Sequence, residues 1–229
     1  EGCRYSTQDI RRLTEALAAE TLRTQNPCRI VAPDAGSYRS LMSDETYRAF
    51  TGGNDVFDGG NNRLNAGMYR CHVRELLGKP AGSRATDILS VHSYWCDQGG
   101  TDVDILTGIR RAVLKELDHA AGNHELWMTE YCVMKRGRDL GMDTAMRVAR
   151  VLHADLVDAG ASAWHWWLAV SPYDYKDGLI YTDYRTSGKQ NVLVSKTLWV
   201  LGNYSRFVRP GARRIEATCV PEADGTCGR

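Results

Sequence analysis

The stretch L-W-M-T-E-Y at residues 126–131 is a short apolar run that ends in a glutamate. A run that is apolar on both faces is typical of a buried strand in a parallel sheet. Similar runs lie at residues 88–94 and 163–170, and a fourth at residues 29–32 is ended by Pro33. We therefore predict four buried strands in this chain.

Segments with helical periodicity separate these four runs. The first predicted helix starts after Ser6, with Asp9 as capping partner, and the second carries Met68 to Leu77. The third opens at Thr101, the fourth is capped by Asp143, and the fifth spans residues 192–207. Strands that alternate with helices indicate βαβ units and hence an α/β fold with a parallel sheet. Four units are too few to close a barrel, so a small doubly wound sheet and half of a larger barrel both remain open. Residues 213–220 look like a strand of a further unit.

Composition and charge exclude two classes of partner. The 229 residues carry a net charge of +1, which gives no electrostatic reason to expect nucleic acid or an anionic membrane surface. Arg110, Arg111 and Lys115 lie in a helical pattern and are interpreted as a solvated face. The apolar runs are far shorter than the roughly 20 residues of a membrane-spanning helix. We expect neither nucleic acid nor membrane as a partner.

The seven cysteines favour an oxidising compartment, and we expect a secreted protein. Cys219 and Cys227 flank a turn-rich segment that suits a local disulfide loop. The other cysteines leave the pairing open: Cys3, Cys28, Cys71, Cys96 and Cys132.

No spacing typical of metal ligands accompanies these cysteines. The chain has no C-x-x-C pair, and the loop with Asp55, Asp58 and Asn61 lacks the alternating ligands of a calcium loop. We expect no metal and no organic cofactor.

The candidate site residues stand where the predicted strands end. Parallel α/β folds place their functional groups at the carboxyl ends of the strands. Aromatic rings that stack on sugars, together with polar groups that hold hydroxyls, are typical of a carbohydrate site. The candidates for substrate binding are Asp34, His92, Tyr94, Trp95, Trp164, Trp166 and Trp167.

Glu130 is the candidate catalytic residue. It follows an apolar run, and charged groups are rarely buried without a reason. A carboxylate at this place suits nucleophilic attack on an anomeric carbon. From position alone, a structural acid held in a salt bridge is an equal alternative. From the residues alone, a core histidine is the more frequent role for His92, and a core is the more frequent place for the tryptophans.

Three motifs resemble glycoside hydrolase family 30: S-V-H-S-Y-W (90–95), L-W-M-T-E-Y (126–131) and L-W-V-L-G-N-Y-S-R-F-V-R-P-G-A-R-R-I (198–215). The resemblance covers nearly the whole chain. It implies a (β/α)8 barrel joined to a β-sandwich side domain, and a retaining mechanism with two catalytic glutamates. Residues 1–10 resemble the segment after strand four in members that cleave β-1,6-galactan.

The resemblance assigns roles to individual residues. Glu130 is similar to the nucleophile at the end of strand seven, and His92 and Tyr94 to a pair on strand six. A tryptophan within residues 163–167 matches the aromatic platform of strand eight, and Asp34 stands at the end of strand five. Residues 1–209 would form the C-terminal half of the barrel, strands five to eight, and residues 210–229 the start of the side domain.

One departure concerns the acid/base glutamate, which the family carries in an Asn-Glu-Pro type motif at the end of strand four. The sequence has no such motif, so we expect this residue upstream of Glu1, together with strands one to four. The chain alone is then expected to be inactive and to need that N-terminal half. Its first and last strands should have exposed edges.

The predicted function is hydrolysis of β-linked polysaccharide, with endo-β-1,6-galactanase as the first choice. β-1,6-Glucan, glucuronoxylan and β-fucosides are alternative substrates within the family. A non-catalytic carbohydrate-binding barrel and a small α/β module unrelated to sugars are alternatives of other classes.

Overall fold

The computed structural model describes residues 5–24, 28–51, 71–77, 86–97, 103–120, 124–184, 188 and 191–217. Cys3, Cys219, Cys227, Met68 and the loop of residues 54–65 lie outside these ranges, and so do the expectations placed on them.

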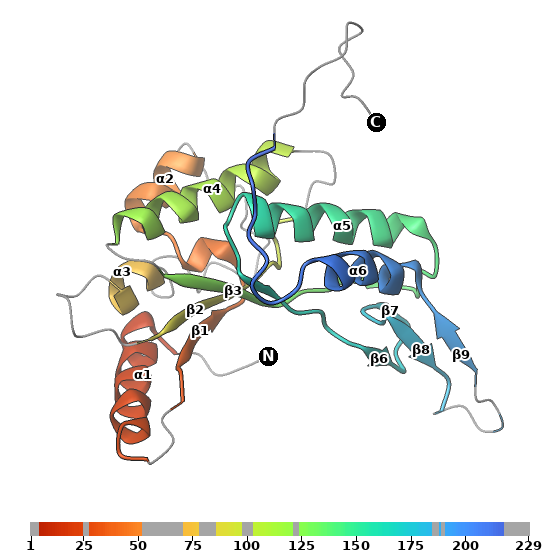
Figure 1. Ribbon diagram of the computed structural model, residues 1–229, viewed down its shortest axis with the longest axis horizontal. Helices are drawn as coiled ribbons and strands as arrows, with labels where there is room; N and C mark the ends of the chain where they lie inside the picture. The colour runs from red at the N-terminus through yellow and green to blue at the C-terminus, as the bar shows by residue number, and fades with distance from the viewer. Residues whose placement is uncertain are drawn as a thin grey trace, which may run out of the picture.

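A four-stranded parallel sheet forms the centre of the molecule (Figure 1). It consists of β1 (Val31–Ala35), β2 (Ile88–His92), β3 (Glu125–Glu130) and β5 (Ala163–Trp164), in the order β1-β2-β3-β5. A doubly wound sheet reverses its strand order, whereas the strands of a (β/α)8 barrel follow one another around the sheet. The order here has no reversal, so the chain forms part of a barrel. β1 and β5 are the two edges of this sheet, as expected.

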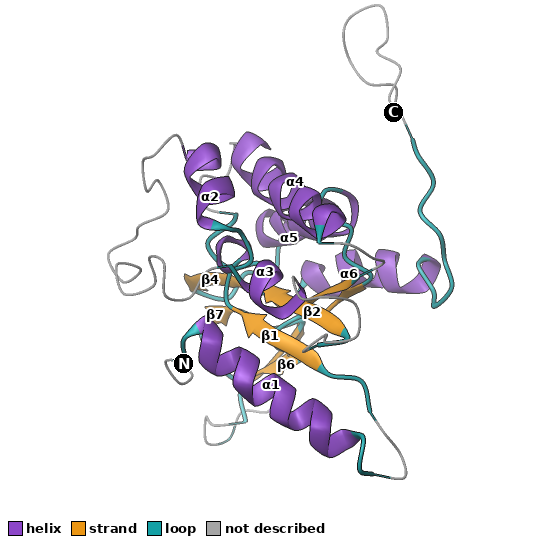
Figure 2. Cartoon of the chain, turned by 90° about the vertical axis from the view of Figure 1, so that its left-hand side faces the viewer, coloured by secondary structure: helices purple, strands orange, loops and turns teal. Residues whose placement is uncertain are grey.

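Helices pack on one side of the sheet, as Figure 2 shows for α2, α4 and α5. The helical elements are α1 (Thr7–Thr21), the 3-10 helix η1 (Tyr38–Ser40), α2 (Asp44–Thr51), α3 (His72–Leu77), α4 (Val103–His119), α5 (Met142–Val157) and α6 (Lys196–Phe207). The predicted capping pair is confirmed, because Ser6 and Asp9 form a reciprocal capping box at the start of α1.

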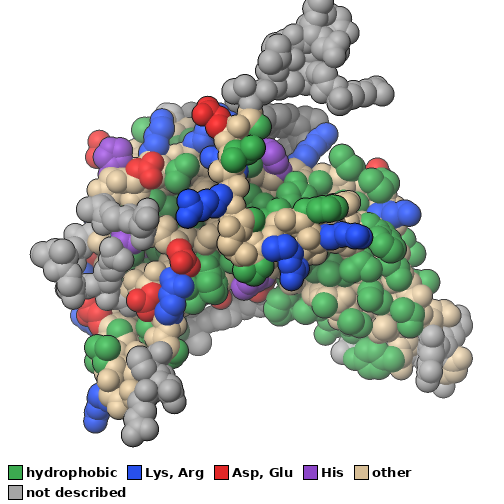
Figure 3. Space-filling view, in the orientation of Figure 1, with side chains coloured by type: hydrophobic (Ala, Val, Ile, Leu, Met, Phe, Trp, Pro, Cys, Tyr) green, Lys and Arg blue, Asp and Glu red, His purple; other side chains and the backbone are tan. Residues whose placement is uncertain are grey.

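The main core lies between the sheet and these helices. Leu89, Val91 and Leu126 leave the strands on the helix side and are buried against Ile109 and Val113 of α4. Because side chains alternate along a strand, their neighbours face the other side, which would be the inside of the barrel. Figure 3 shows the surface hollowed between the part that carries α1 and the part that carries β6, β8 and β9.

Two small sheets follow the central one along the chain. β4 (Val133–Arg136) pairs with β7 (Tyr175–Lys176), and β6 (Val170–Ser171) joins β8 (Ile180–Thr182) and β9 (Val192–Val194). The prediction of one strand over residues 163–170 was therefore wrong, because the chain leaves the barrel sheet after Trp164. The helix predicted for residues 192–207 begins only at Lys196, since residues 192–194 belong to β9.

Three further local predictions need correction. Pro33 lies inside β1 instead of ending it, which an edge strand tolerates because it needs fewer ladder hydrogen bonds. Asp139, not Asp143, holds the start of α5, with Oδ1 accepting from the Gly141 amide at 2.8 Å. Residues 213–217 form no strand.

Arg110 was interpreted as part of a solvated helix face, and the structure shows the opposite. Its side chain has no exposed surface, and its Nε lies 2.6 Å from Oδ1 of the equally buried Asp155. The pair joins α4 to α5.

The cysteines that the structure describes, Cys28, Cys71, Cys96 and Cys132, all carry free thiols. Within the described ranges, no helix combines the length and the apolarity needed to cross a membrane.

Candidate active site

A cleft of about 1010 Å³ opens at the carboxyl ends of the barrel strands. It brings together six of the eight residues expected from the sequence: Asp34, His92, Tyr94, Trp95, Glu130 and Trp167. These residues come from β1, β2 and β3 and from the segments that follow β2 and β5. The cleft thus lies where a parallel α/β barrel places its functional groups.

A β-bulge directs Glu130 into this cleft. Val91 pairs with Met128 and His92 pairs with Glu130, so Thr129 is an extra residue in β3. Without the bulge, Thr129 and Glu130 would point to opposite faces of the sheet. With it, Thr129 donates to Asp34 at 2.5 Å while Glu130 accepts from Tyr94 at 2.8 Å. Both side chains therefore belong to the site.

The carboxylate of Glu130 is held by neutral or weakly basic partners. Tyr94 donates its phenolic hydroxyl to Oε1 at 2.8 Å, and Nδ1 of His92 lies 3.9 Å from the same oxygen. The Glu130 side chain keeps 20% of its surface exposed, and within the described residues it forms no ion pair with an arginine or lysine. This geometry argues against the structural salt bridge considered above and leaves the carboxylate available to a ligand.

Burial suppresses the ionisation of the two groups beside Glu130. It raises the pKa of the Tyr94 phenol well above its ordinary value, with the Cys132 thiol and Glu130 adding to the effect. Burial likewise raises the pKa of the Cys132 thiol to about 12. Tyr94 therefore remains a hydrogen-bond donor to Glu130 across the physiological pH range.

Asp34 forms the opposite side of this polar group. Its Oδ1 lies 3.2 Å from Nε2 of His92 and accepts the Thr129 hydroxyl. These contacts with His92 and Thr129 hold the pKa of Asp34 below its ordinary value, although partial burial opposes them. Asp34 is thus ionised at neutral pH.

Trp95 and Trp167 line the cleft, whereas Trp164 and Trp166 do not. Nε1 of Trp164 donates to the buried carboxylate of Asp155 at 2.8 Å. Trp166 stacks on Trp164 with ring centroids 6.2 Å apart and uses its own indole N–H on backbone carbonyls. These two tryptophans belong to the support behind the cleft.

Ser93 anchors the residues at the carboxyl end of β2 from the side opposite the cleft. It lies between His92 and Tyr94 and points away from the cleft, where its hydroxyl donates to both oxygens of Asp155 at 2.8 and 2.9 Å. Arg110 binds the same carboxylate, and the amide of Ser93 donates to the carbonyl of Glu130 at 3.3 Å. The buried ion pair thereby anchors the segment that contacts the candidate nucleophile.

The residues of the far wall of the cleft were not predicted from the sequence. This wall is lined by Met134, Arg136, Tyr173, Asp174, Tyr175 and Asp177, which come from β4, β7 and the segments around β7. Arg138 holds these segments together, because its guanidinium pairs with Asp183 at 2.6 Å and donates to the carbonyl of Tyr173. No local sequence pattern signals this wall, since it depends on pairing between strands about 40 residues apart.

In the described part of the chain, no cluster of three or more histidine, cysteine, aspartate or glutamate side chains has the arrangement of a metal site.

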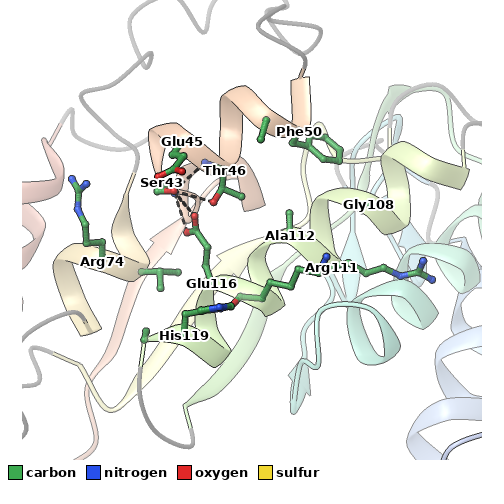
Figure 4. Close-up of a pocket in the computed structure, with 14 residues that line it drawn as sticks. Ser43, Glu45, Thr46, Phe50, Arg74, Gly108, Arg111, Ala112, Glu116 and His119 are labelled. Carbon is green, nitrogen blue, oxygen red and sulfur yellow. Dashed lines mark hydrogen bonds between the residues drawn. The ribbon is translucent and has the colours of Figure 1, made fainter.

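A second cavity, of about 910 Å³, lies among the helices α2, α3 and α4 (Figure 4). It is lined by other residues than the cleft at the carboxyl ends of the strands. Glu116 crosses it and accepts hydrogen bonds from the backbone and the hydroxyl of Ser43. Ser43 in turn accepts from the amide of Thr46. These contacts attach the start of α2 to α4, which is a structural role.

The comparisons with known proteins agree with this architecture. Residues 1–181 match O-Glycosyl hydrolase family 30. The glucuronoxylanase XynC of Bacillus subtilis is 28% identical over 149 residues, which cover 64% of this chain and 30% of that protein. A conserved exported protein from Bacteroides fragilis is 24% identical, with a TM-score of 0.67 over 92% of this chain and 43% of the other. A GH30 endoxylanase from Clostridium papyrosolvens is 21% identical, with a TM-score of 0.51 over 96% and 41%.

This chain therefore spans less than half the length of these relatives. The solved structures, at this level of identity, show the barrel fold alone. The match to the family covers most of the chain, and on that basis the chain belongs to glycoside hydrolase family 30.

Proposed function

We propose that this chain carries the nucleophile of a retaining glycoside hydrolase that acts on β-linked polysaccharide. The observation that carries the proposal is the state of Glu130: a partly exposed carboxylate at the end of a barrel strand, hydrogen-bonded by Tyr94 and unpaired with any described arginine or lysine. Membership of glycoside hydrolase family 30 supports the same role.

In the proposed reaction, an oxygen of Glu130 attacks the anomeric carbon while the bond to the leaving oxygen breaks. The product is a covalent ester between the sugar and the enzyme. A water molecule then gives a proton to the acid/base residue, attacks the same carbon and releases Glu130 as a carboxylate. Tyr94 keeps the attacking carboxylate oriented through its hydrogen bond at 2.8 Å.

The leaving oxygen needs a proton, and Asp34 is unsuited to supply it because its lowered pKa keeps it ionised. We propose that the acid/base glutamate and strands one to four precede Glu1. The open edge of β1 is where a preceding strand would pair. On this proposal, residues 1–209 form the C-terminal half of the barrel, residues 210–229 start a side domain, and the chain alone is inactive.

For the substrate, we propose β-1,6-galactan, on the resemblance of residues 1–10 to the galactan-cleaving members. Xylan is the second candidate, because a glucuronoxylanase and an endoxylanase are among the relatives. We further propose that the protein is exported, as the Bacteroides fragilis relative is described. Release of reducing sugar from purified β-1,6-galactan, β-1,6-glucan and glucuronoxylan distinguishes the substrates.

The nucleophile is tested by trapping the covalent intermediate. The full-length protein is incubated with activated 2-deoxy-2-fluoro glycosides, galactoside and xyloside in parallel, and the labelled peptide is identified by mass spectrometry. We expect one sugar on Glu130, none in the Glu130→Gln variant, and retained labelling in an Asp143→Asn control, because Asp143 is exposed and does not line the cleft. A label on another carboxylate rejects the assignment. Glycan binding with neither label nor turnover identifies a carbohydrate-binding barrel instead.

A further inference from the structure

The far wall of the cleft contains a carboxyl group that the proposed reaction does not use. Asp177 follows β7 and lines the cleft, yet only 4% of its surface is exposed. Its Oδ1 has no hydrogen-bond partner among the described residues. Buried polar atoms are nearly always satisfied in folded proteins, so an unsatisfied carboxyl oxygen at a cleft points to a ligand.

The backbone holds Asp177 firmly in this position. Its carbonyl accepts the amide of Leu168 at 2.5 Å and the indole N–H of Trp166 at 2.8 Å, which connects it to the end of the last barrel strand. The next residue, Gly178, donates its amide to the hydroxyl of Tyr181 at 3.1 Å. These contacts fix the backbone that carries the carboxyl group at the wall of the cleft, which Trp167 also lines.

The surroundings of Asp177 raise the pKa of its carboxyl group. Burial raises its pKa, and the Ser171 hydroxyl and the charge of Arg138 only partly oppose this effect. Arg138 does not bind the carboxyl, because its guanidinium pairs with Asp183 at 2.6 Å and donates to backbone carbonyls. The other titratable groups nearby, the Cys132 thiol and the Tyr181 phenol, are uncharged at neutral pH because burial raises the pKa of each.

A carboxyl oxygen without a partner can accept a hydrogen bond from a sugar hydroxyl, and a carboxyl group that is protonated can also donate one. Trp167 also lines the cleft and is 42% exposed, so its ring is available to stack on a sugar.

We propose that Asp177 is a substrate-binding residue that exchanges hydrogen bonds with a hydroxyl group of the glycan in the cleft. This inference rests on the proposed function. It explains why the fold retains a buried carboxyl oxygen without a partner, which otherwise lowers stability.

The test compares two replacements of similar size in the full-length protein, Asp177→Asn and Asp177→Leu. Asparagine preserves a donor and an acceptor, whereas leucine has neither. Binding of the trisaccharide from the preferred polysaccharide is measured by calorimetry in a Glu130→Gln background, so that no turnover occurs. We expect leucine to weaken the affinity about tenfold and asparagine to keep it within about threefold, since one good hydrogen bond corresponds to roughly that ratio.

Unfolding in urea supplies a readout independent of any ligand. A carboxyl group with a raised pKa in the folded state contributes most at low pH, and that contribution is lost as the pH rises through the raised value. Both Asp177 variants should therefore unfold at the same or a higher urea midpoint than the wild type at pH 8. Asp139→Asn is the matched control: Asp139 accepts amides of Gly141 and Thr144, so its replacement should lower the midpoint.

Three outcomes overturn the inference. Unchanged affinity in Asp177→Leu shows that the carboxyl does not touch the glycan. A lower urea midpoint in Asp177→Leu shows that the carboxyl supports the fold. In the third, Asp177→Asn binds the glycan normally but loses turnover, and a substrate with an activated leaving group together with azide restores that turnover. This result identifies Asp177 as a general acid. Failure of the wild type to bind any of the glycans instead rejects the proposed function itself.

Discussion

The buried pair of Arg110 and Asp155 allows a prediction whose size follows from its contacts. Neither side chain has exposed surface, and their closest atoms are 2.6 Å apart. The Asp155 carboxylate also accepts the Ser93 hydroxyl and the Trp164 indole N–H. Asp155→Asn keeps the size of the side chain but removes the charge that compensates Arg110.

Breaking a buried ion pair from one side costs about 3–5 kcal/mol, because the remaining charge stays buried without a partner. For a chain of this length, that loss lowers the melting temperature by roughly 6–20 °C. Removing both charges together, in Arg110→Met with Asp155→Leu, should recover only part of this loss: an apolar pair has no unpaired charge to bury, but the Ser93 hydroxyl and the Trp164 N–H lose their acceptor.

The assay is urea unfolding followed by tryptophan fluorescence. Arg111 and Asp158 provide a matched control, because they also join α4 to α5, but the Arg111 side chain is 64% exposed. Arg111→Ala should cost less than about 1 kcal/mol. The reasoning is refuted if Asp155→Asn costs no more than this control, because water would then reach the supposedly buried charge.

Three further predictions concern the cleft and the segments behind it. Tyr94→Phe removes the hydrogen bond to Glu130 and should lower kcat of the full-length enzyme about 10- to 100-fold with little change in the urea midpoint; unchanged kcat would exclude an orienting role. Gly178→Ala should destabilise the protein by about 1–3 kcal/mol in urea unfolding, because the new Cβ would lie 2.8 Å from a buried tyrosine ring. Asp139→Ala should cost about 1 kcal/mol at pH 7 through loss of the cap on α5. Hydrogen bonds from Thr144 lower the pKa of Asp139 to about 2, so this cost should shrink as the pH falls from about 4 to 2; a cost independent of pH contradicts it.

Local patterns in the sequence were sufficient to find the barrel strands and most of the helices. Apolar runs and helical periodicity arise from the burial of one segment against its neighbours, so they are visible in short windows. The residues at the strand ends followed from the same reasoning, and Glu130, His92, Tyr94 and Asp34 do converge. The roles of these residues came from the family resemblance, and they remain proposals.

Tertiary contacts decided everything that depends on residues far apart in the chain. Arg110 looked solvated because its partner, Asp155, is 45 residues away in α5. The far wall with Asp177 exists because β4 pairs with β7 across a long connection. Among the tryptophans, Trp167 lines the cleft, whereas Trp164 and Trp166 form hydrogen bonds behind it.

The bulge in β3 shows most clearly which features follow from the local sequence and which require the tertiary structure. The sequence alone determined that a glutamate ends a buried strand, since the apolar run and its polar end are local features. Strict alternation would place Thr129 and Glu130 on opposite faces of the sheet. Only the register with β2, in which His92 pairs with Glu130 directly after Val91 pairs with Met128, turns the carboxylate into the cleft. Strand register results from pairing between separate segments, so no single segment encodes it.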